Sequence, residues 1–179
     1  MKKILLMGIL ALVVSLSVRA QESLAGRVYH CANMMKGEME AMKSDFDKDL
    51  QKEKDATAEE KKEANKMVQG MTDAIISTMT LKFLSDKEVE LSVLVKYDDA
   101  KAKANGVPWL LRKLVSGKLK NKAKDATFTG NTPYTFNGKT VKLTNPKSKK
   151  ELVFQLTPDG KALLYTTNKD KTVRLARTK

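Results

Sequence analysis

Alternating hydrophobic residues dominate the chain beyond residue 80. Val89, Leu91, Val93, Val95 and Tyr97 occupy every second position of one stretch, with mostly polar residues between them. Successive side chains of a β-strand point to opposite faces, so this spacing places all five on one face. The stretch predicts a strand with one buried face, which restricts the chain to folds in which a sheet covers a core.

Short turn sequences separate the strands that follow. Asn137-Gly138 tolerates the positive φ angles of a tight hairpin turn, and in Thr157-Pro158-Asp159-Gly160 the proline presets a turn that the glycine completes. Such short links join antiparallel neighbours. The expected strands cover about 26–32, 81–83, 89–97, 134–136, 140–143, 152–156, 162–167 and 172–177, the last after a turn at 168–171.

Eight antiparallel strands in serial order predict a closed up-and-down barrel. Closure pairs the first strand with the last and removes the edges that an open sheet would expose. We expect a mainly β, α+β fold: an eight-stranded antiparallel barrel with an antiparallel helical hairpin inserted at 33–78. Residues 21–179 are expected to form this single domain.

The inserted segment follows a helical period. Met35, Met39, Met42, Phe46 and Leu50 recur at steps of three and four, which predicts a helix over about 33–54 with Asn33 as its N-cap. Thr57 and Glu60 form a capping box that begins a second helix over about 57–78. The expected buried stripe of this second helix is Ala64, Met67, Val68, Met71, Ala74, Ile75 and Met79.

Seven of the nine methionines fall between residues 34 and 79, and four of them, Met34, Met35, Met39 and Met42, follow close behind His30 and Cys31. Thioether and thiolate sulfurs could hold Cu(I) in an exported protein. The same methionines could instead pack the two helices against each other, or form a pliable apolar lid over the barrel mouth. We favour packing and expect no metal site.

The first twenty residues have the pattern of an export signal. Lys2 and Lys3 precede an apolar run from Ile4 to Val18, too short to cross a bilayer, and Ala20 is a small residue suited to cleavage. We expect cleavage after Ala20 and a periplasmic or secreted protein.

The remaining chain has an acidic part followed by a basic part. Residues 33–80 hold 8 Lys and 11 acidic residues, whereas 81–179 hold 22 basic and 9 acidic residues. Residues 101–124, within a basic amphipathic segment at 99–124, contain no acidic residue. Leu111, Leu114, Val115 and Leu119 are spaced to form one apolar side of a helix, which could dock on the barrel or lie on an anionic membrane. Its candidate anion-binding residues are Arg112, Lys113, Lys118, Lys120 and Lys122.

Catalysis is not expected. His30 is the only histidine, and its neighbour Cys31 would point to the opposite face of a strand, so the two cannot form a dyad. No nucleophile elbow, zinc-protease motif or phosphate-binding glycine loop is present, and we expect no cofactor. Export and an aromatic content of 6% argue against nucleic acid as a partner.

A first strand in Leu24–Tyr29, followed by hairpins ending in Tyr134–Gly138 and Leu156–Gly160, resembles the lipocalin-like secreted domains of Gram-negative bacteria. The resemblance implies a lipocalin-like barrel whose mouth binds small apolar molecules and which is not an enzyme.

Two functional hypotheses remain. The first is an exported, noncatalytic protein that holds a small apolar or amphiphilic molecule in the barrel mouth. The second is an envelope interaction protein that binds anionic lipid or glycan through residues 101–124. Oligomeric state and the role of Cys31, which could pair between two molecules, stay open. The candidate lining residues of the first hypothesis are Tyr97, Trp109, Phe136, Phe154 and Tyr165.

Overall fold

The computed structural model describes residues 23–167 and 171–179, except for the side chains of 118–122. The expected signal peptide, residues 1–20, therefore lies outside the described residues. So does most of the expected turn at 168–171, of which only Lys171 is described.

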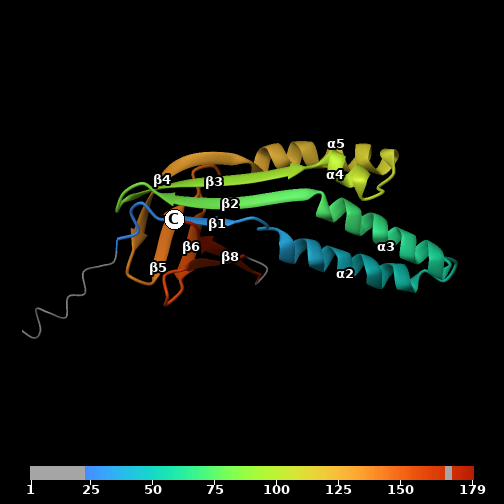
Figure 1. Ribbon diagram of the computed structural model, residues 1–179, viewed down its shortest axis with the longest axis horizontal. Coiled ribbons are helices and arrows are strands. Elements are labelled where there is room, and N and C mark those ends of the chain that lie inside the picture. The colour runs from blue at the N-terminus through green and yellow to red at the C-terminus, as the bar shows by residue number, and fades with distance from the viewer. Residues whose placement is uncertain (1–22, 168–170) are drawn as a thin grey trace, which may run out of the picture.

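Within the described residues, eight antiparallel strands form a closed barrel in serial order, and β8 pairs with β1 (Figure 1). This confirms the predicted fold class. The strands are β1 (Val28–Cys31), β2 (Ile75–Phe83), β3 (Glu88–Tyr97), β4 (Phe128–Phe136), β5 (Thr140–Thr144), β6 (Glu151–Leu156), β7 (Ala162–Thr166) and β8 (Thr172–Arg177).

The hairpin turns have the backbone that their sequences require. Gly138 has φ +86° and Gly160 has φ +66°, values in the left-handed region that favours glycine. Asn137 also accepts hydrogen bonds through its side-chain oxygen from the backbone N–H of Thr140, at 2.7 Å. These turns fix the register of the strands that they join.

Hydrophobic side chains from alternate strand positions fill the barrel. One row of directly paired residues crosses five strands, in the order Phe136, Val141, Phe154, Tyr165 and Val173. Paired residues point to the same face of a sheet, so this row forms one layer of the core.

The barrel end farthest from the helices is closed by side chains. Leu24 is fully buried there. The ring of Phe83 lies edge-on to Tyr29 and Tyr134, with centroids 5.9 and 4.8 Å away. The Tyr29 hydroxyl donates to the carbonyl oxygen of Gly160 at 3.1 Å, which fastens the turn between β6 and β7 over this end.

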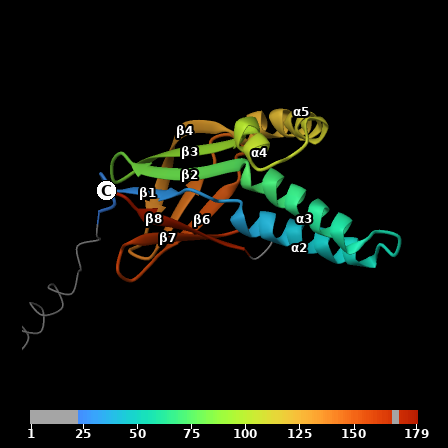
Figure 2. The ribbon, with the colours of Figure 1, turned by 45° about the vertical axis from the view of Figure 1, so that its right-hand side comes forward.

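The four helices of the described residues lie at the opposite end of the barrel (Figures 1 and 2). The hairpin of α2 (Lys36–Lys52) and α3 (Ala58–Asp73) projects away from the barrel between β1 and β2. The basic segment forms α4 (Asp99–Ala104) and α5 (Trp109–Ala126) between β3 and β4. The helical hairpin was predicted, and the Thr57–Glu60 capping box is confirmed.

Two details of the predicted hairpin are wrong. The second helix ends at Asp73, not 78, because β2 begins at Ile75 and buries Met79 inside the barrel. The N-cap of α2 is Met35, not Asn33. Asn33 instead forms a parallel bridge with Ser77 of β2, which holds the start of the hairpin against the sheet.

Candidate functional site

The barrel interior around Phe154 is filled. A side chain without accessible area touches no space large enough for a water molecule. Phe154 is fully buried, and its ring lies 5.2 Å from that of Tyr165, centroid to centroid. Phe136 and Tyr165 pack, half-buried, against the same core. The largest fully buried side chains are Tyr29, Phe83, Phe154, Leu24, Leu81, Leu91, Leu163, Leu175, Val89 and Val141.

Tyr97 lies outside this core. It packs, half-buried, against a second small cluster formed by Ala74, Ala102 and Val107, between the barrel end and α4. Its hydroxyl is buried and has no hydrogen-bond partner among the described residues. Burial raises the pKa of Tyr97 above its ordinary value, and the nearby Asp99 carboxylate raises it further.

Arg112 does not lie on the surface as the second hypothesis expected. Only 8% of it is exposed; its Nε donates to the carbonyl oxygen of Val107 at 3.1 Å, and its Nη1 pairs with the Asp99 carboxylate. The guanidinium therefore fixes α5 to α4 and to the loop between them. The side chains of three other expected cationic residues, Lys118, Lys120 and Lys122, lie outside the described residues.

The first turns of α5 present an apolar face to solvent. Trp109, Leu110 and Leu114 are 58%, 68% and 56% exposed. The Lys113 ammonium lies 4.4 Å from the centroid of the Trp109 ring. We call these four residues the α5 face. The helix docks through its other side, where Leu111 contacts the second cluster and Ala123 the barrel core.

Two sequence-based expectations for this helix need correction. Leu114 was expected to share one apolar side with Leu111, but Leu114 lies in solvent while Leu111 contacts the second cluster. Trp109, expected to line a barrel mouth beside Phe154, points into solvent at the start of α5. The five candidate lining residues are thus divided among the barrel core, the second cluster and the surface.

The side chains of His30 and Cys31 point to opposite faces of β1. Cys31 packs, half-buried, against the barrel core with Met34 and Met35. His30 Nδ1 lies 2.9 Å from the hydroxyl of Thr80 on the neighbouring strand. Among the described residues, no group of three or more His, Cys, Asp or Glu side chains is placed to hold a metal ion.

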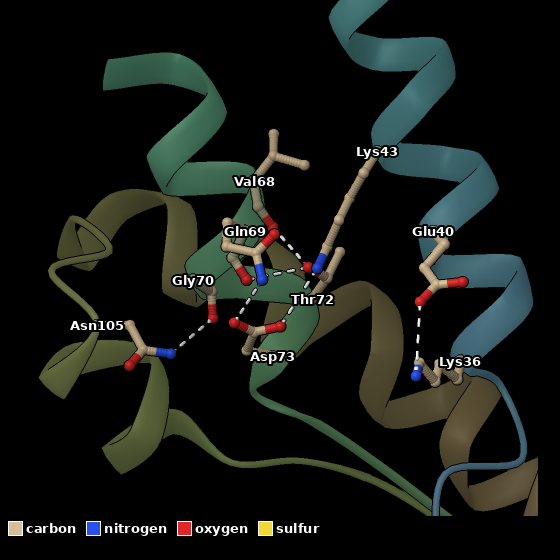
Figure 3. Close-up of polar contacts among 9 residues, drawn as sticks. All are labelled: Lys36, Glu40, Lys43, Val68, Gln69, Gly70, Thr72, Asp73 and Asn105. Carbon is tan, nitrogen blue, oxygen red and sulfur yellow. Dashed lines mark hydrogen bonds and ion pairs between the residues drawn. The ribbon is translucent and has the colours of Figure 1, made fainter. Parts of the chain in front are cut away.

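A polar pocket of about 440 Å³ lies where α2, α3, β2 and α4 meet (Figure 3). Its two carboxylates are paired with its own lysines: Asp73 with Lys43 at 3.2 Å, and Glu40 with Lys36 at 3.8 Å. Burial alone would raise the pKa of Asp73, but the hydrogen bond from Gln69 and the Lys43 ammonium outweigh it and lower that pKa. The lining also includes Lys101, so three lysines stand against two carboxylates.

Comparisons with known proteins add nothing to this geometry. No protein family, curated protein or solved structure matches the chain. The lipocalin-like relationship stays a prediction, because an eight-stranded barrel alone does not identify a family. Among the described residues, no helix is both long and apolar enough to span a bilayer.

The junction between α3 and the loop before α5 depends on Gly70. A Cβ there would stand 2.9 Å from Cγ2 of Val107 and 3.3 Å from the backbone oxygen of Asn105. Alanine is the better helix former by about 1 kcal/mol, but overpacking costs about 1–3 kcal/mol. We expect Gly70→Ala to destabilise the protein by about 1 kcal/mol in urea denaturation followed by circular dichroism.

Gly117 supplies the matched control, because a Cβ at this helical position would meet nothing within 4 Å. Gly117→Ala should stabilise the protein by up to about 1 kcal/mol. Equal effects of the two substitutions would contradict the close approach at Gly70.

Proposed function

We propose that this protein is an exported, noncatalytic protein that binds anionic lipid surfaces through the α5 face. The observation that carries the proposal is the exposure of Trp109, Leu110 and Leu114 together, beside a lysine and within a segment free of acidic residues from 101 to 124. An apolar helix side flanked by lysines can lie in the headgroup region of a membrane. Tryptophan is enriched at that depth.

Useful affinity for a membrane needs both the burial of the apolar side chains and the attraction between lysines and anionic lipid. Fully burying a large apolar side chain contributes about 1.5–3 kcal/mol, and part of this remains available for residues that are already half covered. Each lysine near an anionic leaflet adds about 1 kcal/mol, an attraction that salt screens within a Debye length. The proposed binding is therefore selective for anionic lipid and weakened by salt.

The single tryptophan makes the proposal directly testable. The protein is purified from the periplasm of a bacterial host, and its intact mass should show that residues 1–20 have been removed. It is then mixed with vesicles of phosphatidylcholine containing about 30% phosphatidylglycerol. We expect co-sedimentation, a blue shift of Trp109 emission, and at least about tenfold weaker binding at physiological than at low ionic strength. Failure to bind these vesicles at low salt would overturn the proposal.

Binding to heparin, an acidic glycan, tests whether the α5 face binds glycans and not lipid surfaces. A glycan offers phosphate-like or sulfate charges but no apolar phase, so it can attract lysines without changing the surroundings of the Trp109 ring. Heparin binding as tight as vesicle binding, with no blue shift on vesicles, would assign the face to glycans instead.

The hypothesis of a small apolar ligand in the barrel mouth stays a prediction. Fully buried side chains such as Phe154, Leu163 and Leu175 occupy the interior. A ligand there would have to displace them, whereas the α5 face is already exposed.

A further inference from the structure

The barrel wall is split between β1 and β8 near the helices. The two strands pair at Tyr29 with Arg177 and at His30 with Ala176, and their ladder ends there. β8 nevertheless continues to Thr172, where it still pairs with Thr166 of β7. Among the described residues, one edge of β8 thus has no paired strand over its first residues.

The split arises because the chain after β1 turns toward β2. The backbone N–H of Met34 donates to the carbonyl oxygen of Ser77 at 3.0 Å, and the N–H of Met35 donates to the Ser77 hydroxyl at 3.1 Å. These bonds pull the start of the helical hairpin away from β8. The chain therefore cannot continue the β1–β8 ladder.

The direction of the backbone N–H groups along β8 shows which of them point toward the split. The N–H of Thr178 donates to Val28 of β1, whereas the N–H of Arg177 donates to Lys161 on the β7 side. Backbone groups alternate in direction along a strand, so Thr172 and Arg174 direct theirs toward the β1 side. Within the described residues, the β1–β8 ladder includes neither of them.

A groove of about 440 Å³ occupies the split. Its floor is apolar, because Cys31, Met34 and Val173 all contact the barrel core. Its rim carries Lys36, Lys171 and Arg174 against Glu38 and Glu40, and Glu40 is paired with Lys36. The Lys171 side chain crosses toward α2, where a Cβ on Gly37 would lie 3.6 Å away. The groove thus combines a strand edge, an apolar floor and a rim on which three basic side chains outnumber two acidic ones.

We propose that this groove binds a short extended peptide that has alternating apolar and acidic residues and pairs with the free edge of β8 at Thr172 and Arg174. An added strand gains its affinity from main-chain hydrogen bonds, and its alternate side chains give specificity. Here the apolar side chains face Met34 and Val173, and the acidic ones face Lys171 and Arg174. An acyl chain could fill the floor but would leave the backbone groups of β8 without partners. The α5 face takes no part, so this proposal is independent of the lipid-binding function.

The probe is the capped peptide acetyl-Glu-Val-Glu-Val-Glu-amide, added to isotope-labelled protein. We expect amide chemical-shift changes concentrated at Thr172, Val173 and Arg174. A peptide with Lys in place of each Glu should bind at least about tenfold more weakly, as should one that is N-methylated at alternate residues, because each loses a charge match or hydrogen bonds.

Thr172→Pro is the decisive variant. Proline is tolerated at the first residue of a strand and at an edge, so the barrel should fold, but the N–H directed into the split is removed. We expect about tenfold weaker peptide binding, whereas Thr172→Ala, which keeps that N–H, should bind like the unmodified protein. Far-UV circular dichroism checks that both variants fold.

Three results would overturn the proposal: no shift changes at millimolar peptide, equal binding of the N-methylated peptide, or unchanged binding by folded Thr172→Pro. The proposal would also be overturned if dodecanoate, but not the peptide, protected Cys31 from alkylation. That result would assign the groove to an amphiphile.

Discussion

The double variant Leu110→Glu/Leu114→Glu should lose at least about thirtyfold in affinity for anionic vesicles, because burial of the exposed parts of the two leucines contributes about 2 kcal/mol. The new carboxylates would also repel the anionic surface. Both leucines are more than half exposed, so the free energy of unfolding should change by no more than about 0.5 kcal/mol per substitution. Vesicle co-sedimentation and urea denaturation measure the two quantities.

Met42→Glu/Phe46→Glu is the matched control. These two residues are also exposed apolar side chains, at 48% and 36%, but they lie on α2. The control changes the net charge by the same amount without altering the α5 face, and should bind vesicles nearly as well as the unmodified protein. An equal loss in both variants would attribute binding to overall charge and contradict the proposed face.

The barrel could be predicted because its signals are local. The alternation from Val89 to Tyr97 specifies one buried face whatever else the chain does, and Asn137-Gly138 specifies a tight turn. The end of α3 could not be located so well. Met71, Ile75 and Met79 are spaced four apart, as in a helix, while Ser77, Met79 and Leu81 are spaced two apart, as in a strand. Pairing of all of β2 with β3, from Ile75 onward, decides for the strand.

The α5 face was only half predictable. The sequence shows a basic segment with leucines and one tryptophan, but which side of the helix docks depends on contacts distant in sequence. Arg112 reads as a surface cation until Asp99 is placed beside it by the turn between α4 and α5. Asp99, an acidic residue immediately before the basic run, was the available signal for that pairing.

The groove between β1 and β8 was missed because the first strand is shorter than expected. The sequence predicts a strand over about 26–32, which would extend the pairing with β8, whereas β1 covers only Val28–Cys31. The chain leaves the sheet because Ser77 binds the backbone of Met34 and Met35. A hydroxyl that binds a backbone group 42 positions away leaves no local pattern in the sequence.

Phe154→Ala should destabilise the barrel by about 3–5 kcal/mol, the usual cost of removing a fully buried phenylalanine ring. That is a large share of the roughly 5–15 kcal/mol that holds a domain folded. Phe154 lies in the middle of the row that joins five strands and contacts the ring of Tyr165, so truncation leaves a cavity that rigid neighbouring strands cannot close. Urea denaturation monitored by far-UV circular dichroism measures the loss.

Phe46→Ala is the control for this substitution, because the Phe46 side chain is 36% exposed and should contribute less, about 1–2 kcal/mol. A loss below about 1 kcal/mol for Phe154→Ala would contradict the filled interior. It would mean that the Phe154 ring borders a space that solvent or a ligand already occupies, which is the arrangement that a small apolar ligand in the barrel requires. The size of this one loss therefore distinguishes a barrel that serves as a scaffold for α5 from a barrel that is itself the binding site.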